Sequence, residues 1–212
     1  MPCTFISYKK PPSSGSNDPL PPLQIGDGTS ILEKLPLYGL YDYSQGGMIY
    51  LAGELIAAGA KAGGAITKIG FEFRNWTRGY RRENQTIKIS HVAESEHPRA
   101  GYPDYRDFTL TNTTIVKTFD FVAENEDGWQ TFDLTTAPFI WNGSSNILIS
   151  WENRDGTWKG GYGWLRGEAY LGDERANRSN SWYEDNAYPT APAANVKGRP
   201  NLRINVDAEP PR

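Results

Sequence analysis

The stretch Ile69-Gly70-Phe71-Glu72-Phe73-Arg74 decides the fold, because its apolar residues alternate with small or charged ones. Successive side chains of a β-strand point to opposite faces, so this period of two predicts a strand with one face in a core and one in water. The alternation returns in Ile87-Lys88-Ile89-Ser90, in Ile147-Leu148-Ile149-Ser150-Trp151 and in Leu202-Arg203-Ile204-Asn205-Val206. Further strands are predicted at 36–43, 47–55, 104–110, 114–122, 129–134 and 162–170. About ten strands separated by turns predict an all-β, antiparallel two-sheet sandwich.

The composition agrees with this prediction. The 212 residues include 22 Gly and 15 Pro, and 13% of them are aromatic. Helix breakers at this density exclude a coiled coil or a bundle of long helices, and the aromatic content excludes a disordered chain. The one Ala-rich stretch, 52–62, is interrupted by Gly53 and Gly59, and we interpret it as the end of a strand followed by a loop.

Proline divides the chain into zones. Residues 1–24 are expected to form an extended Pro-rich arm without a core of its own, residues 25–206 the sandwich, and residues 207–212 a C-terminal tail. The arm's candidate assembly residues are Pro11, Pro12, Pro19, Pro21 and Pro22. Such an arm is expected to lie against a neighbouring subunit.

Two turns look alike, because Asp127-Gly128-Trp129 and Asp155-Gly156-Thr157-Trp158 both place Asp-Gly just before a Trp. Asp-Gly supplies the positive φ that tight hairpins need, so we predict two similar hairpin corners. The alternative is a pair of loops that present aromatic residues to a ligand.

The order of these signals resembles a known group of domains. An opening turn at 25–30 leads to Pro36-Leu37-Tyr38-Gly39-Leu40-Tyr41-Asp42-Tyr43, and later come Gly128-Trp129-Gln130-Thr131-Phe132 and Asn146-Ile147-Leu148-Ile149-Ser150-Trp151. The succession resembles jelly-roll-like β-sandwich domains of bacteriophage virion proteins and of secreted bacterial surface or adhesin proteins. The resemblance implies display, adhesion or assembly rather than catalysis. Since the N-terminus shows no signal peptide, we favour the virion group.

The densest aromatic stretch, 158–166, gives the candidate ligand site. Aromatic rings stack on the apolar faces of sugars, while neighbouring polar groups orient the hydroxyls. The candidate glycan-binding residues are Trp158, Tyr162, Trp164, Asp155 and Arg166. A period of two would place Trp158, Tyr162 and Trp164 on one side, and the alternative is that this side faces the core.

Other clusters carry weaker signals. The loop 75–82 holds three Arg and two aromatic residues, but a net charge of −3 gives no basic domain around it, so we expect no nucleic-acid partner. His91 and His97 bracket two glutamates, yet on a strand they would lie about 20 Å apart, and we expect no metal and no cofactor. Glu152 and Glu168 could form a glycosidase pair, but no motif selects them among 25 acidic residues.

We therefore expect a non-enzymatic structural or assembly protein of a bacteriophage virion, made in the host cytoplasm and docking through its arm, in capsid decoration, a fibre or the tail. Its expected partners are neighbouring subunits, with the chain a homo-oligomer, and we expect no membrane partner. The alternative is a carbohydrate-binding or adhesion module that acts outside the cell or at its surface.

Overall fold

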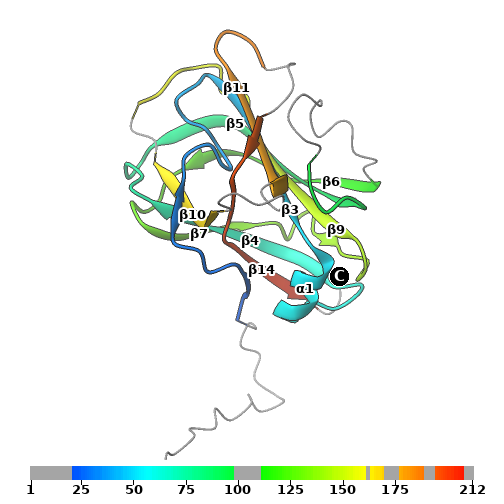
Figure 1. Ribbon diagram of the computed structural model, residues 1–212. Coiled ribbons are helices and arrows are strands. Elements are labelled where there is room, and N and C mark those ends of the chain that lie inside the picture. Colours follow the sequence, from blue (N-terminus) through cyan, green and yellow to red (C-terminus); the bar gives the residue numbers. More distant parts are fainter. Residues whose placement is uncertain (1–20, 98–110, 161–162, 170–176, 189–193, 208–212) are drawn as a thin grey trace, which may run out of the picture.

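The computed structural model describes residues 21–97, 111–160, 163–169, 177–188 and 194–207. Within these residues the chain forms two antiparallel β-sheets and one short helix (Figure 1). The predicted all-β, two-sheet antiparallel class is therefore confirmed. Residues 1–20, and with them Pro11, Pro12 and Pro19 of the expected arm, lie outside the described residues, as does the predicted strand 104–110.

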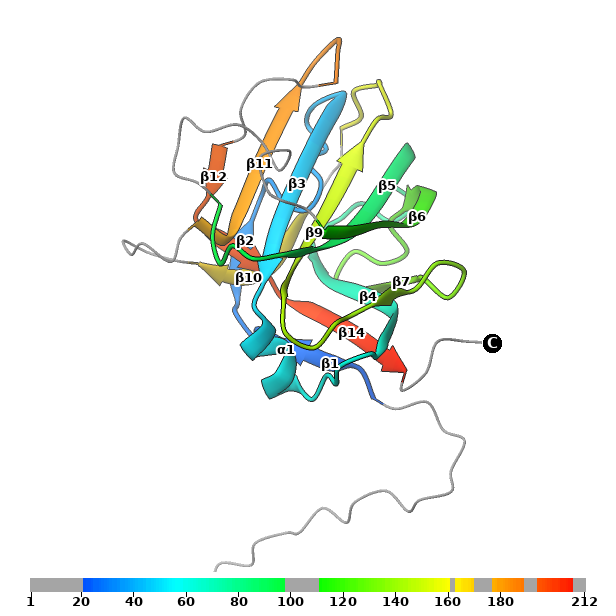
Figure 2. The ribbon, with the colours of Figure 1, turned by 90° about the vertical axis from the view of Figure 1, so that its right-hand side faces the viewer.

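Sheet B, as we name the smaller sheet, has the strand order β12-β11-β3-β9-β5-β6. Its strands are β3 (Tyr43–Tyr50), β5 (Arg81–Val92), β6 (Thr111–Val122), β9 (Asn146–Asn153), β11 (Ser179–Glu184) and β12 (Ala194–Val196). Strands β3, β9 and β11 run side by side (Figure 2).

Sheet A, the larger sheet, has the order β1-β14-β4-β10-β13, with β2 paired to β10 and both β7 and β8 paired to β4. Its strands are β1 (Leu23–Ile25), β2 (Ser30–Leu32), β4 (Ala65–Arg74), β7 (Gly128–Asp133), β8 (Phe139–Ile140), β10 (Trp164–Ala169), β13 (Gly198–Pro200) and β14 (Leu202–Asp207). Residues 69–74, whose alternation predicted a strand, form the second half of β4, in the middle of this sheet.

The core lies between the two sheets and is built by the predicted alternation. Ile69, Phe71 and Phe73 of β4 face Ile147, Ile149 and Trp151 of β9, and all six are buried. The Trp151 ring packs edge-on against Phe132 of sheet A at 5.1 Å and contacts Phe71 at 6.4 Å. Its indole N–H is satisfied by Gln85 Oε1 at 2.9 Å, which removes the cost of burying that donor.

The prediction that the second face of β9 is wet is wrong. Leu148, Ser150 and Glu152 point away from sheet A, yet each is at most 4% exposed. The chain after β5 returns over this face, where the His97 backbone N–H donates to the Asn177 carbonyl at 2.6 Å. Leu148 thereby joins Ile49 and Val92 in a second, smaller apolar cluster. The period of two predicts where the strand lies, but it does not show whether a later segment of the chain covers the outer face of that strand.

The interpretation of 52–62 as a strand end and loop is also wrong, because α1 (Ala52–Ala58) is a helix. The Glu54 carboxylate accepts the Leu51 backbone N–H at 2.8 Å and so satisfies one free donor of the first turn. Gly59 then ends the helix in the left-handed region at φ 108°. Glu54 is held in place by the two terminal guanidinium nitrogens of Arg199, at 2.6 and 2.7 Å.

The predicted strand 36–43 is wrong except for its last residue, since β3 begins at Tyr43. The carbonyl oxygens of Gly39 and Tyr41 accept hydrogen bonds from the Arg82 guanidinium. A strand would have offered such carbonyls to a neighbouring strand, so a side chain replaces the ladder here.

The two Asp-Gly turns are not hairpin corners. Residues 123–127 join β6 of sheet B to β7 of sheet A, and the chain after β9 passes from sheet B to β10 of sheet A. The expected positive φ is present at both glycines, 104° at Gly128 and 74° at Gly156. The local turn chemistry was correct, but a hairpin also requires the flanking strands to pair.

Candidate functional site

One end of sheet B gathers several loops. Ser44 of β3 and Gln85 of β5 both pair with Asn153 of β9, and Tyr43 pairs with Glu184 of β11. The first residues of β3 and β5 therefore lie beside the last residues of β9 and β11, at the upper end of Figure 2. The loops that precede or follow these strands meet there. The helix α1 follows the other end of β3, so it lies at the opposite end of the molecule.

Among the described residues, six aromatic side chains that are not buried collect at this end. We call this group the aromatic end: Tyr38, Tyr41, Tyr43, Trp158, Tyr183 and Tyr188. Trp158 is 61% exposed, the highest value among the large exposed hydrophobic residues that the structure describes. Large apolar side chains are usually buried, so an exposed concentration of them indicates a surface that contacts something else.

Three of the tyrosines form one group. The Tyr183 ring lies 4.3 Å from the ring of Tyr41 and 4.7 Å from that of Tyr38. Lys34 reaches the same group, with its Nζ 5.1 Å from the centre of the Tyr183 ring and 3.2 Å from the Tyr183 hydroxyl. The result is a half-exposed aromatic surface with an ammonium group at its edge.

A second group lies across the strand end. Tyr43 and Tyr188 meet edge to face at 6.4 Å, and the Arg154 guanidinium lies 3.6 Å from the centre of the Tyr188 ring. The Tyr188 hydroxyl donates to Gln45 Oε1, which anchors the ring to β3.

Glu152 binds two cations, Arg154 of this second group and Lys88. Its carboxylate binds Lys88 Nζ at 2.5 Å and Arg154 Nε at 3.0 Å. Burial raises the pKa of the Glu152 carboxyl, but hydrogen bonds and charges from Lys88 and Arg154 outweigh it, so the pKa lies below its ordinary value. A carboxylate held this way is an anchor for Arg154.

Arg82 braces the loops that carry the aromatic residues. It is fully buried, and its guanidinium donates to the carbonyls of Gly39, Tyr41 and Thr157. Its Nε donates to the Tyr80 hydroxyl at 2.8 Å. One side chain therefore ties the loop of Tyr38 and Tyr41 to the residue that precedes Trp158.

Asp155, predicted to orient a ligand, forms a second brace. Its side chain is 2% exposed, and its Oδ2 accepts from the Glu83 backbone N–H at 2.6 Å and from Lys159 Nζ at 2.9 Å. The neighbouring Gly156 N–H donates to the Asp42 carbonyl at 3.2 Å. These bonds fix the loop from which Trp158 projects.

Of the other predicted site residues, Trp164 lies on a strand, whereas Trp158 lies in a loop. Trp158 lies in the loop before β10, so the argument from a period of two does not apply to it. Trp164 is half-buried on β10 of sheet A, and its carbonyl accepts the Trp76 indole N–H at 2.9 Å. Tyr162 and the side chain of Arg166 lie outside the described part of the chain.

Sequence reasoning missed Tyr38, Tyr41, Tyr183, Tyr188 and Arg82 as site residues. The spacing of Tyr38, Tyr41 and Tyr43 was a usable signal, because three tyrosines in six residues are frequent at binding surfaces. Tyr183 and Tyr188 carried no such signal, since only the pairing of β11 with β3 brings them to the same place.

The His91/His97 and Glu152/Glu168 pairs considered from the sequence do not come together in one site. His91 contacts Phe139 of sheet A, with ring centres 4.6 Å apart, whereas His97 lies against Gly47 on the far face of sheet B. Glu152 and Glu168 lie on strands of different sheets. Within the described ranges, no group of three or more His, Cys, Asp or Glu is arranged to hold a metal ion. None of the described helices has the length and apolarity needed to cross a membrane.

The fold defines a class, an all-β protein of two antiparallel sheets with one short helix among the described residues. Compared with known proteins, the chain matches no family model, no curated protein and no solved structure.

Proposed function

We propose that this chain is a non-enzymatic display module of a bacteriophage virion, which attaches by its α1 end and recognises a surface glycan with its aromatic end. The observation that carries the proposal is a set of half-exposed tyrosine rings together with the exposed Trp158, on loops braced by the buried Arg82. Leu23 and Asp207, the first residue of β1 and the last of β14, lie at the opposite end. Attachment and recognition are thus separated along the molecule.

The chemistry of the aromatic end suits a sugar. Tyr41, Tyr183 and Trp158 offer ring faces that stack on C–H surfaces of a pyranose, and hydroxyl groups of tyrosine can bond its hydroxyls. Rigid aromatic side chains lose little conformational entropy on binding, and the braces reduce the loss further. Lys34 and Arg154 add cations at the edges, which favours a saccharide that carries acidic groups.

The connections between the sheets support the finer jelly-roll interpretation. The connections from β6 to β7 and from β9 to β10 both pass from sheet B to sheet A. Such crossings are typical of double-sheet jelly rolls, which occur in capsid and lectin domains.

The test is glycan-array screening followed by calorimetry with the best ligand. Trp158→Ala and Tyr41→Ala are expected to weaken binding about tenfold or more, because truncating a central aromatic residue removes most of its contact energy. Trp129→Ala is the matched control, since this half-exposed ring lies on β7 of sheet A and contacts Arg203 at 4.0 Å. Equal affinity of the Trp158→Ala variant and the wild-type chain, or binding by neither, would refute glycan recognition at this end.

A further inference from the structure

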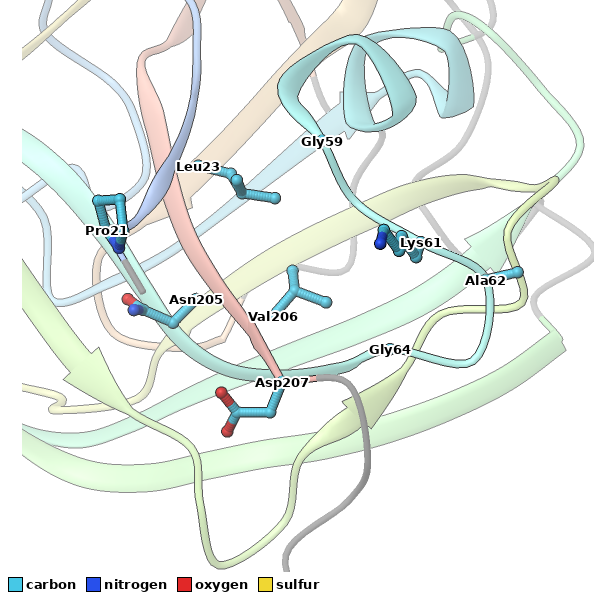
Figure 3. Close-up of a pocket in the computed structure, with 9 residues that line it drawn as sticks. All are labelled: Pro21, Leu23, Gly59, Lys61, Ala62, Gly64, Asn205, Val206 and Asp207. Carbon is cyan, nitrogen blue, oxygen red and sulfur yellow. The ribbon is translucent and has the colours of Figure 1, made fainter. Parts of the chain in front are cut away.

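A pocket of about 260 Å³ opens at the α1 end, between β1, the end of β14 and the loop after α1 (Figure 3). Its apolar wall comes from Leu23, Ala62 and Val206. In Figure 3 the side chains of Leu23 and Val206 project into the space between β14 and that loop. Nothing in the glycan proposal uses this pocket.

The pocket wall depends on glycine. A Cβ added at Gly64 would meet Val206 Cγ1 at 2.4 Å, and one at Gly59 would meet Leu23 at 3.5 Å. At Gly64 the loop backbone therefore packs directly beside Val206, where a side chain would overlap it, whereas the distance at Gly59 is an ordinary contact. An open apolar hollow of this size accommodates one or two apolar side chains of another segment.

The N-terminal segment is suited to this pocket. Pro21 lines its rim, so the 20 residues that precede Pro21 are attached next to it. They include Pro11, Pro12, Pro19 and Leu20, and proline-rich segments dock in apolar grooves at a small entropic cost. The charges match as well, because Lys61 and Asp207 stand at the pocket while Lys9, Lys10 and Asp18 lie in the segment.

The direction of β1 disfavours docking of a chain into its own pocket. Leu23 pairs with Ile204 in antiparallel register, so the described residues before it, Pro22 and Pro21, lead alongside β14 toward its end, and Pro21 lies at the rim of the pocket. To enter, the preceding segment would have to reverse next to Pro21. A residue before proline favours extended backbone, and Pro21 itself precedes Pro22, so a tight reversal is disfavoured here. The segment of another molecule meets no such restriction and reaches up to about 66 Å when extended.

We propose that this pocket binds residues 1–20 of a second copy of the chain. The inference rests on the assembly half of the proposed function and names its contact. Because each copy has one arm and one pocket, arm exchange links copies at their α1 ends and leaves the aromatic ends free.

The experiment mixes two full-length chains that both carry Cys3→Ser. One carries a nitroxide on Ser13→Cys, and the other has isotope-labelled Leu and Val methyl groups. We expect the Leu23 and Val206 methyl signals to be lost in the mixture and to return when the nitroxide is reduced. The signal of Val122, on β6, is expected to remain.

A blocking variant sharpens the result. Lys61→Trp, at an exposed position of the pocket wall, is expected to restore the Leu23 and Val206 signals, whereas Ala187→Trp, at an exposed position of the aromatic end, is the matched control and should change nothing. Loss of signal only when both labels are on one chain would overturn the proposal in favour of docking within a chain.

Sedimentation of the unlabelled full-length chain distinguishes a failure of the pocket inference from a failure of the proposed assembly. If the chain self-associates but the methyl signals in the mixture persist, the pocket inference fails and assembly stands. If it stays monomeric at every concentration and the signals persist, both the pocket inference and the assembly half of the proposed function fail.

Discussion

At the scale of single residues, Arg82 holds the loops of the aromatic end together. Replacing it by Met would leave the carbonyls of Tyr41 and Thr157 without this donor, and the Gly39 carbonyl with only the Tyr80 hydroxyl at 3.4 Å. Each buried acceptor left unpaired costs about 1–3 kcal/mol. We therefore expect Arg82→Met to lower the free energy of unfolding by about 3 kcal/mol or more in urea titration.

Its neighbour Arg81 is the matched control. Arg81 is 54% exposed and pairs with Asp120 at 2.6 Å and with Glu83 at 3.7 Å. Exposed pairs contribute about 0–1 kcal/mol, so Arg81→Met should change stability little. Equal losses in the two variants would mean that Arg82 does not brace the loops.

His97 makes stability depend on pH. Burial lowers its pKa to about 4, with a hydrogen bond to the Gly47 backbone opposing the shift. Between pH 4 and the ordinary value of 6.5 the unfolded chain binds more protons, so stability rises with pH through this window and is lost as pH falls. The full effect amounts to about 3 kcal/mol.

The measurement is urea unfolding of the wild-type chain and of His97→Gln between pH 7 and pH 4. The wild-type chain should lose stability steadily as the pH falls, and the variant should show a flatter profile over the same range. Parallel profiles would assign the acid sensitivity to other groups. The main alternatives are His91, whose pKa is also lowered by burial and which acts below the same ordinary value, and the carboxylates of Glu54 and Glu152, whose lowered pKa values place their effect at more acidic pH.

Single residues also show which parts of the site the sequence could reveal. The alternation of the strand around Trp151 predicts that this side chain is buried. The Asp155-Gly156 signal predicts a turn just before Trp158, and this residue is exposed in the loop there. The bracing role of Arg82 was hidden, because its acceptors lie 41 to 75 residues away along the chain. A local pattern cannot report a contact that only tertiary packing creates.

At the scale of elements, two glycines of the α1 region, one inside the helix and one just after it, have opposite roles. Gly53 is helical and a Cβ added there meets nothing within 4 Å, whereas Gly59 ends the helix at φ 108°. Gly53→Ala should raise the melting temperature, since Ala is favoured over Gly by about 0.8–1.0 kcal/mol in a helix. Gly59→Ala should lower it by a similar free energy, because L-residues are strained at positive φ.

Thermal unfolding of the two variants checks this pair. A lower melting temperature for Gly53→Ala would mean that this segment is not helical in solution. That result would return it to the strand end and loop expected from the sequence.

The same elements show why strands were easier to predict than α1. Each long strand shows the alternation of apolar and polar residues in its own sequence, so β4, β5, β9 and β14 can be predicted from the sequence alone. The helix has a single buried side chain, Leu55, and depends on Glu54, which is held by Arg199 from β13 far along the chain. A short helix stabilised from outside leaves little trace in its own sequence.

At the scale of the whole molecule, the separation of the two ends predicts how the chain can be attached to a surface. Immobilisation through Cys3, the only cysteine, should leave glycan binding intact. Immobilisation through Cys3→Ser/Ala187→Cys, where Ala187 is exposed next to Tyr188, should abolish most of it. Surface plasmon resonance measures both, and equal binding capacity would argue against recognition at the aromatic end.

The pairing of Leu23 with Ile204 has a consequence for how the body can be rewired. Cα atoms of directly opposite residues in an antiparallel pair are about 4.5–5.5 Å apart, so the two ends of the described body are neighbours in space. A short linker could close them, and the chain could be reopened in an exposed loop as a circular permutant. For the same reason, the body could be inserted whole into a surface loop of a carrier protein, whose own ends would scarcely have to move apart.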